Sequence, residues 1–286
     1  GKCNYNCLHC FNAADNAPSM SEWFLKEAEK FLDEARECGV NAFTITGGEP
    51  MLHRNFMDIL TGIYERGMYV EEINTNGYFL RQEVLDQMKE RGIRPLMKIS
   101  FDGIGHHDWL RGRKGAEEDA IRAIRLCRAN DFPVMIQTNV HRHNLDTLLE
   151  TAKLMDSLGV WKMRIIRTSE APRWKENAGD AALGLTEYYD RMLEFASAYM
   201  KTGCRMDVII SCIWQLWDDS CFVPGKGIQG FASSMQGGQR HGGSCCQWKY
   251  ISLSSAVWHL RTEWGYPWQC EKGISEASAK CQPVSV

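Results

Sequence analysis

Apolar positions between residue 19 and about residue 200 follow two alternating patterns. In one, apolar residues recur every three or four positions, which is typical of a helix that buries one face. In the other, short apolar runs contain few polar residues, which is typical of a strand covered on both faces. The first pattern predicts helices over residues 24–38, 56–66, 82–90, 117–129, 145–155 and 186–200. The second predicts strands over residues 42–46, 69–74, 96–101, 134–140 and 163–167.

Local signals mark the ends of the first helices. Ser19 and Glu22 have the spacing of an N-terminal capping box. Gly39 and Gly67 stand where a left-handed residue commonly ends a helix.

The alternation of strands and helices predicts the fold class. Parallel strands need crossover helices, so this order predicts an α/β barrel or a doubly wound sheet. No Gly-x-Gly-x-x-Gly motif follows the first strand, which disfavours a Rossmann dinucleotide site. Polar segments do follow the strands: Gly47-Gly48-Glu49-Pro50, Asn74-Thr75-Asn76-Gly77, Ser100 with Asp102, and Asn139. Because ligands bind at the carboxyl ends of parallel strands, we expect these segments to form one site.

Three cysteines near the N-terminus, Cys3, Cys7 and Cys10, are spaced C-x3-C-x2-C. Three thiolates are one short of the four that normally close an iron–sulfur cube, so one iron would stay open to a ligand. A structural zinc site usually takes four ligands, and only His9 is nearby to supply a fourth. The alternative of three buried free thiols does not account for the spacing.

The motif Cys3-Asn4-Tyr5-Asn6-Cys7-Leu8-His9-Cys10, followed by Thr44-Ile45-Thr46-Gly47-Gly48-Glu49-Pro50, resembles the radical S-adenosylmethionine (SAM) enzymes. The resemblance implies that the three cysteines hold a 4Fe-4S cluster whose open iron binds the amino and carboxylate groups of SAM. It also implies that the reduced cluster cleaves SAM to methionine and a 5′-deoxyadenosyl radical, which abstracts hydrogen from the substrate. The family fold is a partial (β/α)6 barrel.

The resemblance also implies roles for single residues. Gly47, Gly48, Glu49 and Pro50 would hold the amino group of SAM, although the same segment also suits an ordinary strand-to-helix turn. Ser100-Phe101-Asp102-Gly103 followed by His107-Asp108-Trp109-Leu110-Arg111 is similar to a segment of the peptide- and protein-modifying members.

By that match Ser100 would contact the ribose or carboxylate region and Arg111 the SAM carboxylate, with Asp102 beside them. Arg111 could instead be a surface residue, and Asp102 could cap its own turn. Asn139, at the end of the fourth strand, either faces the ribose or adenine of the cofactor through its amide or supports the core. His9 either lies near the adenine or is a solvated loop histidine.

The family's first strand lies immediately before the cysteine loop, but this chain begins at Gly1-Lys2-Cys3. We therefore expect that the first barrel strand is missing and that the sequence is a fragment. A barrel without that strand would expose a sheet edge.

Composition narrows the possible functions. Formal net charge is −3 with 33 Lys and Arg against 36 Asp and Glu, which gives no basic footprint for nucleic acid. No apolar run reaches membrane-spanning length and no signal peptide opens the chain. Twelve cysteines in a chain of this size, with a cluster motif among them, favour a reducing cytoplasm over disulfides. The resemblance adds anaerobic metabolism, because an open cluster is sensitive to oxygen.

The alternating apolar pattern ends and cysteines become frequent beyond about residue 203. We therefore divide the chain into a barrel domain, 1–202, and a cysteine-rich tail, 203–286. Seven cysteines follow the boundary: Cys204, Cys212, Cys221, Cys245, Cys246, Cys270 and Cys281. Peptide-modifying radical SAM enzymes often carry a SPASM or twitch domain there with auxiliary 4Fe-4S clusters. The tail lacks the C-x2-C-x5-C-x3-C run of a full SPASM domain, so an incomplete or divergent version is expected.

The resemblance predicts a radical SAM enzyme that modifies a ribosomal peptide or a protein side chain, with flavodoxin or ferredoxin as the electron donor. Two alternatives stay open. One is an enzyme acting on a small molecule such as a haem-pathway intermediate. The other is a truncated, non-catalytic module that binds a cluster.

Overall fold

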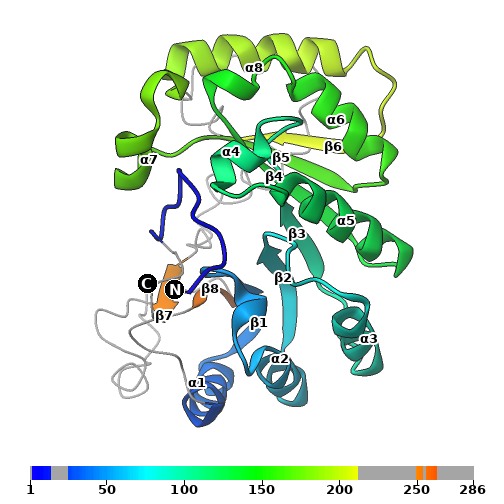
Figure 1. Ribbon diagram of the computed structural model, residues 1–286. Coiled ribbons are helices and arrows are strands. Elements are labelled where there is room, and N and C mark those ends of the chain that lie inside the picture. The colour runs from blue at the N-terminus through cyan, green and yellow to red at the C-terminus, as the bar shows by residue number, and fades with distance from the viewer. Residues whose placement is uncertain (1, 14–24, 212–248, 254–255, 263–286) are drawn as a thin grey trace, which may run out of the picture.

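The computed structural model describes residues 2–13, 25–211, 249–253 and 256–262 (Figure 1). The expected capping box at Ser19 and Glu22 lies outside these residues, as do all cysteines of the tail except Cys204. In the described ranges, no helix is long and apolar enough to cross a membrane.

One eight-stranded sheet organises the molecule, in the order β6-β5-β4-β3-β2-β1-β8-β7. The strands are β1 (Val40–Ile45), β2 (Tyr69–Thr75), β3 (Leu96–Ser100), β4 (Val134–Val140), β5 (Lys162–Arg167), β6 (Asp207–Ile210), β7 (Lys249–Leu253) and β8 (Ala256–Thr262). The helices are α1 (Leu25–Glu37), α2 (Phe56–Glu65), α3 (Gln82–Glu90), α4 (His107–Arg111), α5 (Ala116–Ala129), α6 (Leu148–Ser157), α7 (Pro172–Asn177) and α8 (Leu185–Tyr199). Short 3-10 helices cover Pro50–Leu52, Arg142–Asn144 and Gly179–Ala181.

The expected α/β fold is confirmed. Strands β1 to β6 are parallel, and helices connect them in sequence. In Figure 1 the sheet is curved, with the larger helices along its outer side and the N-terminal segment on the other side. The five strands predicted from apolar runs correspond to β1 through β5, and the six predicted helices to α1, α2, α3, α5, α6 and α8. Gly39 and Gly67 have φ angles of 77° and 72°, as their positions at helix ends predict.

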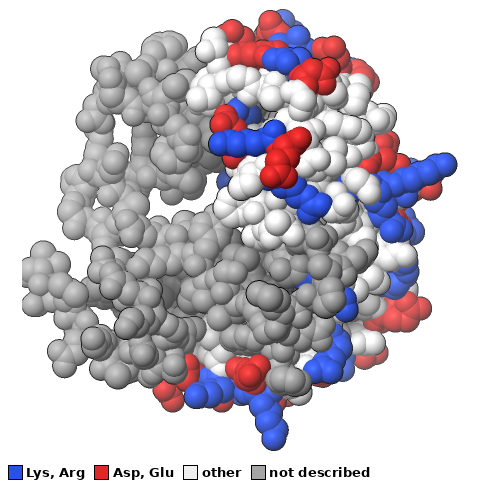
Figure 2. Space-filling view, turned by 60° about the vertical axis from the view of Figure 1, so that its left-hand side comes forward, with Lys and Arg blue, Asp and Glu red and all other residues white. Residues whose placement is uncertain are grey.

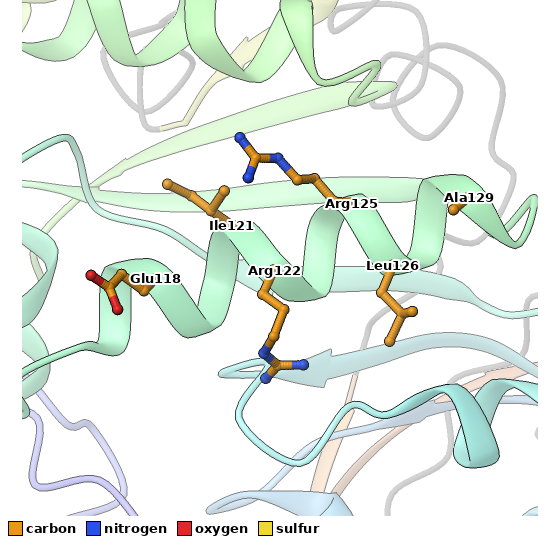
Figure 3. A pocket seen from close by; sticks show the side chains of 6 residues that line it. All are labelled: Glu118, Ile121, Arg122, Arg125, Leu126 and Ala129. Atoms are coloured by element: carbon orange, nitrogen blue, oxygen red, sulfur yellow. The ribbon is translucent and has the colours of Figure 1, made fainter.

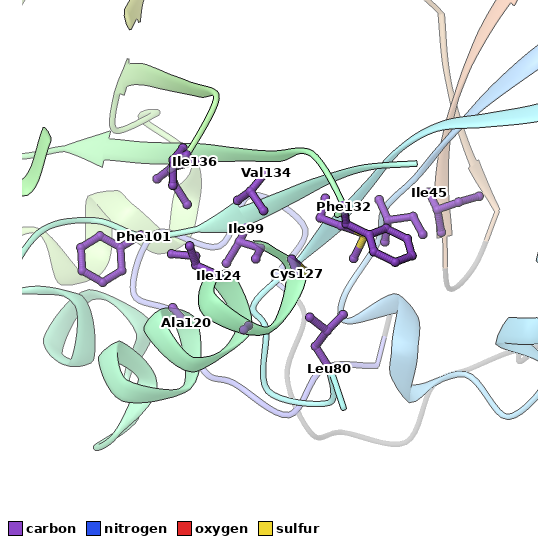
Figure 4. Packing of buried hydrophobic residues seen from close by; sticks show 14 of the residues in the cluster. Ile45, Leu80, Ile99, Phe101, Ala120, Ile124, Cys127, Phe132, Val134 and Ile136 are labelled. Atoms are coloured by element: carbon purple, nitrogen blue, oxygen red, sulfur yellow. The ribbon is translucent and has the colours of Figure 1, made fainter. Parts of the chain in front are cut away.

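The outer face of the sheet forms the main core with the helices. Figure 4 shows Ile99 and Val134 of neighbouring strands packed against Ile124 and Cys127 of α5, with Phe132 from the loop that follows. Each of these five side chains is fully buried. Burial of apolar side chains between the sheet and its helices is the main favourable contribution to the folding free energy of this core.

The inner face of the sheet is more polar than the sequence pattern predicts. Lys98 alternates with the core residues Met97 and Ile99, so it points to the opposite face. Its Nζ donates a hydrogen bond to Oε1 of Glu72 on β2 at 3.1 Å. The inner face is therefore lined in part by a partly buried ion pair rather than by apolar residues.

The expected open edge at β1 is paired in the structure. Strand β8 lies antiparallel to β1, with Phe43 opposite Leu260 and Ile45 opposite Trp258. At the other end, β6 adds a sixth parallel strand to β5, just beyond the boundary drawn at residue 202. Pairing on both sides satisfies backbone groups of β1 that an open edge would leave to solvent.

Candidate functional site

The cysteine loop, residues 2–13, gathers its three thiols in one place. Cys3 and Cys7 are buried, and they pack with Tyr5 and Ala116, with Cys10 against the same cluster. Burial raises the pKa of Cys3 to about 12, and the neighbouring charges of Cys7 and Cys10 act in the same direction. The three thiols therefore belong to one packed cluster and influence one another's charge.

The loop is held against the barrel from several elements. The Leu8 backbone N–H donates to the Leu110 carbonyl at 2.9 Å, and the Glu49 N–H donates to the Lys2 carbonyl at 3.1 Å. Gly112, at the end of α4, has a φ of 61°, and a Cβ there would meet the carbonyl group of Asn6. The glycine therefore permits a close approach that seats the cysteine loop on α4.

The donor set of this loop fits an iron–sulfur cluster. Three thiols on one short loop supply three of the ligands that such clusters take. Burial raises the pKa of Cys7, and the Arg111 guanidinium beside it opposes that rise. Within the described ranges, no group of three or more His, Cys, Asp or Glu is placed to hold a single metal ion. In a cube each cysteine binds a different iron atom, so that arrangement is not needed.

The Gly47-Gly48-Glu49-Pro50 segment follows β1, as expected. Gly47 has a φ of 146°, which glycine adopts most easily, and its carbonyl accepts a hydrogen bond from Asn12 of the cysteine loop at 3.2 Å. Pro50 opens the 3-10 helix Pro50–Leu52, with Glu49 as its N-cap. The segment is thus both the turn after β1 and a neighbour of the cysteine loop.

Glu49 is buried and its carboxylate ties two strand ends together. Oε1 accepts hydrogen bonds from Thr75 Oγ1 at 2.8 Å and from the Met51 N–H at 3.3 Å. Oε2 accepts one from the Asn76 N–H at 2.8 Å. Burial nevertheless raises the pKa of Glu49 to about 7. These bonds give Glu49 a role in joining β1 to β2 that its sequence position alone does not reveal.

A second polar cluster lies where β3 and β4 end. Asp102 is fully buried, and its Oδ2 accepts a hydrogen bond from Arg111 Nε at 2.6 Å. Its Oδ1 accepts from both the backbone N–H and the side-chain amide of Asn139, at 2.9 and 3.1 Å. Arg111 Nη1 in turn points to the Cys7 sulfur at 3.9 Å. Hydrogen bonds therefore connect three expected cofactor residues to one expected cluster ligand.

The charges in this cluster stabilise each other. Burial alone would raise the pKa of Asp102, but the positive charge of Arg111 holds it well below its usual range. Burial likewise opposes the charge of Arg111, and the neighbouring carboxylate more than compensates, so the pKa of Arg111 lies above its ordinary value. At neutral pH the pair is therefore ionised, a buried ion pair with several hydrogen bonds.

Neutral imidazoles surround the ion pair. Burial lowers the pKa of His9 to about 3 and that of His141 to about 4. His107, whose Nδ1 lies 3.1 Å from Asp102 Oδ2, also has a pKa lowered by burial. Buried ring nitrogens of all three, His9 Nδ1, His107 Nε2 and His141 Nε2, have no hydrogen-bond partner in the part of the chain that is described. Such groups normally find a partner, so they mark a place where a ligand with polar atoms would fit.

Sequence reasoning missed His141, which follows β4 directly and is fully buried. It stands two positions after Asn139, a spacing that places both side chains on the same face of an extended segment, and that spacing was the available signal. Ser100, by contrast, is where it was expected, at the end of β3 and paired with Gln137 of β4.

The remaining surface features lie away from this site. Figure 3 shows a groove of about 580 Å³ along the outer side of α5, lined by Glu118, Ile121, Arg122, Arg125, Leu126 and Ala129. None of the expected site residues lines it. Figure 2 shows Lys and Arg interspersed with Asp and Glu over the described part of one face, without a broad patch of one sign. Cys204, in the segment before β6, is partly buried.

Comparison with known proteins gives one family. Residues 1–155, more than half of the chain, match the model of the radical SAM superfamily. The chain is 33% identical over 159 residues to the AdoMet-dependent heme synthase of Methanosarcina barkeri, covering 55% of this chain and 45% of the relative. It is 25% identical over 166 residues to the PqqA peptide cyclase of Granulibacter bethesdensis, and the match covers 57% of this chain and 44% of the relative. The chain thus spans about half the length of the curated relatives that it matches.

Solved structures agree at the level of the fold. The structure of SuiB from Streptococcus suis bound to S-adenosylmethionine matches with a TM-score of 0.65, covering 78% of this chain and 51% of SuiB. The two chains are 14% identical, so the likeness concerns the fold.

Proposed function

Because the chain belongs to the radical SAM superfamily, whose members use a 4Fe-4S cluster and SAM, we propose that Cys3, Cys7 and Cys10 hold the cluster. The observation that carries this proposal is the gathering of the three thiols beside Arg111. When bound, the cluster and SAM together supply a one-electron cleavage of SAM that starts hydrogen abstraction from a substrate. The protein positions these groups and excludes water.

SAM would lie at the carboxyl ends of β1, β3 and β4. Carbonyl groups near Gly47 and Gly48 suit its ammonium group, and Ser100 suits its ribose or carboxylate. Arg111 uses one N–H for Asp102 and one for Cys7, which leaves three of its five N–H groups for the SAM carboxylate. Asn139 and His9, with the unpartnered Nδ1 of His9, suit the adenine or ribose. Pro50 fixes the turn that carries Glu49, whose own bonds keep the segment in place.

For the substrate, we propose a ribosomal peptide or a protein side chain. Similarity to the PqqA peptide cyclase supports it, as does the segment from Ser100 to Arg111, which resembles that of peptide-modifying members. A second candidate, a small molecule of the haem pathway, is supported by the 33% identity to the heme synthase.

Further expectations from the sequence belong to this proposal. A reducing, oxygen-poor cytoplasm and an electron donor such as flavodoxin or ferredoxin suit an open cluster. Residues 203–286 would form a cysteine-rich extension, of SPASM or twitch type, that could hold auxiliary clusters.

The first test is formation of 5′-deoxyadenosine from SAM after anaerobic reconstitution with iron and sulfide and reduction by dithionite. We expect Cys7→Ala to lose the product together with the iron bound at the N-terminal site. Cys127→Ala removes another buried thiol, on α5 and outside the proposed site, and should keep both. Unchanged product in Cys7→Ala would contradict the proposal.

The substrate class is tested in the same assay. A pooled synthetic peptide library and iron coproporphyrin are added in separate reactions. Faster 5′-deoxyadenosine formation with peptides and their change in mass would support the first candidate. The same result with iron coproporphyrin alone would replace it with the second.

A further inference from the structure

Arg111 lies between a carboxylate and a cysteine, and all three side chains are almost completely buried. Its Nε donates to Asp102 Oδ2 at 2.6 Å, and its Nη1 donates to Cys7 Sγ at 3.9 Å. Exposed fractions are 7% for Arg111, 0% for Asp102 and 9% for Cys7. In such surroundings a charged hydrogen bond is stronger than at the surface.

Asp102 is itself held from several sides. Asn139 binds its Oδ1 through two donors, and His107 lies against its Oδ2. The side-chain amide of Asn144 donates to its backbone carbonyl. Because the carboxylate is fixed by residues of β4 and α4, it fixes the direction of the guanidinium that it binds.

Arg111 therefore presents a directed N–H group and a full positive charge to the Cys7 sulfur. Hydrogen bonds to the sulfurs and the net charge nearby are among the factors that set the reduction potential of an iron–sulfur cluster. Reduction adds negative charge, so a donor and a cation next to a ligand sulfur favour the reduced form.

We propose that Asp102 is a positioning residue that directs Arg111 onto Cys7, and that this contact makes the cluster easier to reduce. The inference rests on the proposed function, in which Cys7 is a cluster ligand. It gives Arg111 a role toward the cluster beyond its expected role toward SAM.

The proposal predicts that Arg111→Lys and Asp102→Asn both lower the reduction potential of the cluster. A change in charge alone would not lower it in both variants. Arg111→Lys keeps the positive charge but loses the planar fork that binds Asp102 and reaches Cys7 at once. The cluster should then become harder to reduce. Asp102→Asn removes a negative charge, which by itself would make reduction easier. If Asp102 acts by directing Arg111, this variant should instead become harder to reduce.

The experiment is a redox titration of the reconstituted cluster, followed by electron paramagnetic resonance, in wild type and both variants without SAM. We expect each variant to shift the ratio of oxidised to reduced cluster about tenfold at a fixed potential, which for one electron corresponds to about 59 mV. Arg66→Lys and Asp33→Asn are matched controls, because Arg66 Nε binds Asp33 Oδ1 at 2.7 Å on the outer helices. Both controls should keep the wild-type potential.

A second measurement compares wild type with Arg111→Lys. Electron–nuclear double resonance should detect an exchangeable proton from Arg111 coupled to the reduced cluster, besides that of the Tyr5 N–H, which donates to Cys3 Sγ at 3.5 Å. Arg111→Lys should lose the first proton and keep the second. Absence of the first proton in wild type, an unchanged potential in Arg111→Lys, or easier reduction of Asp102→Asn would each overturn the inference. Wild-type protein that binds no iron would overturn the proposed function as well, whereas bound iron with an unchanged potential would overturn this inference alone.

Discussion

The Glu49 carboxylate accepts the backbone N–H of Asn76 at 2.8 Å, which ties the turn after β1 to the turn after β2. The same carboxylate also accepts hydrogen bonds from the Thr75 hydroxyl and from the Met51 N–H. Three hydrogen bonds therefore satisfy this buried carboxylate, which lies next to the cysteine loop. One side chain therefore links the two turns beyond the ends of the paired strands.

Replacing Glu49 by Gln should change how stability depends on pH. The pKa of about 7 in the folded protein lies above the ordinary value of 4.5, so the folded state binds the proton more tightly. The contribution of Glu49 to the free energy of unfolding is then fully present below about pH 4.5 and is lost as pH rises through 7. The loss in the wild type should amount to about 3 kcal/mol. Urea unfolding from pH 4.5 to 7.5 measures it. The difference between wild type and Glu49→Gln should follow that slope, and a difference independent of pH would contradict it.

His141→Gln should show the opposite slope. The pKa of His141 falls from 6.5 to about 4 in the folded protein, so the unfolded chain binds the proton more tightly between those values. Wild type should lose about 3 kcal/mol relative to the variant as pH falls from 6.5 to 4. His143→Gln changes an exposed histidine of the same loop and serves as the control for urea unfolding at matched pH. Equal slopes for the two variants would refute the assignment to His141.

Gly112→Ala should disturb the cysteine loop, because a Cβ there meets the Asn6 carbonyl group. Gly105→Ala is a matched control, since Gly105 also has a positive φ of 74° but open space around its Cβ position. Both should lose about 1 kcal/mol for the left-handed backbone. Only Gly112→Ala should also bind less iron after reconstitution, measured as iron and acid-labile sulfide per chain. Equal iron in the two variants would show that the loop tolerates the added atom.

Lys98→Met should destabilise the protein because it leaves the Glu72 carboxylate without its cation, rather than because apolar packing is lost. Lys98 is nearly buried and Glu72 partly buried, so the single variant leaves a carboxylate without its cation at a cost of about 2 kcal/mol. Adding Glu72→Gln should recover most of that loss in a double-mutant cycle measured by urea unfolding. Lys153→Met breaks the exposed pair with Glu150 and should cost less than about 0.5 kcal/mol. A double variant as unstable as the sum of the single ones would mean that the pair does not interact.

The apolar pattern predicted β1 through β5 and their helices because one face of each element packs into the core. Phe43, Ile73, Ile99, Ile136 and Ile165 are all buried there. Elements with few core residues were not predicted. Helix α4 has five residues, and β6 has four, beginning with the exposed Asp207. Short segments of this kind are defined by their tertiary contacts rather than by their own periodicity.

The site residues likewise fall into those that the sequence predicted and those that only the folded structure reveals. Cys7, Asp102 and Arg111 were all named from sequence motifs, each for a separate role. That Asp102 and Arg111 bind each other follows from α4, whose single turn brings the guanidinium back over the end of β3. His141 looks like a loop residue in the sequence, and only its burial and its place beside Asn139 bring it into the site. Pairings between distant residues need the folded geometry, and periodicity does not supply it.

The pairing of β1 with β8 also affects how the chain is made. Ile45 and Trp258 are neighbours in the sheet but about 200 residues apart in the chain. At ordinary rates of synthesis the ribosome needs about 10 to 40 s to cover that distance. During that time β1 has left the ribosome while the strand that covers its edge does not yet exist. A nascent chain in this state lacks the β1–β8 pairing, so chaperone binding early in synthesis should raise the yield of folded protein.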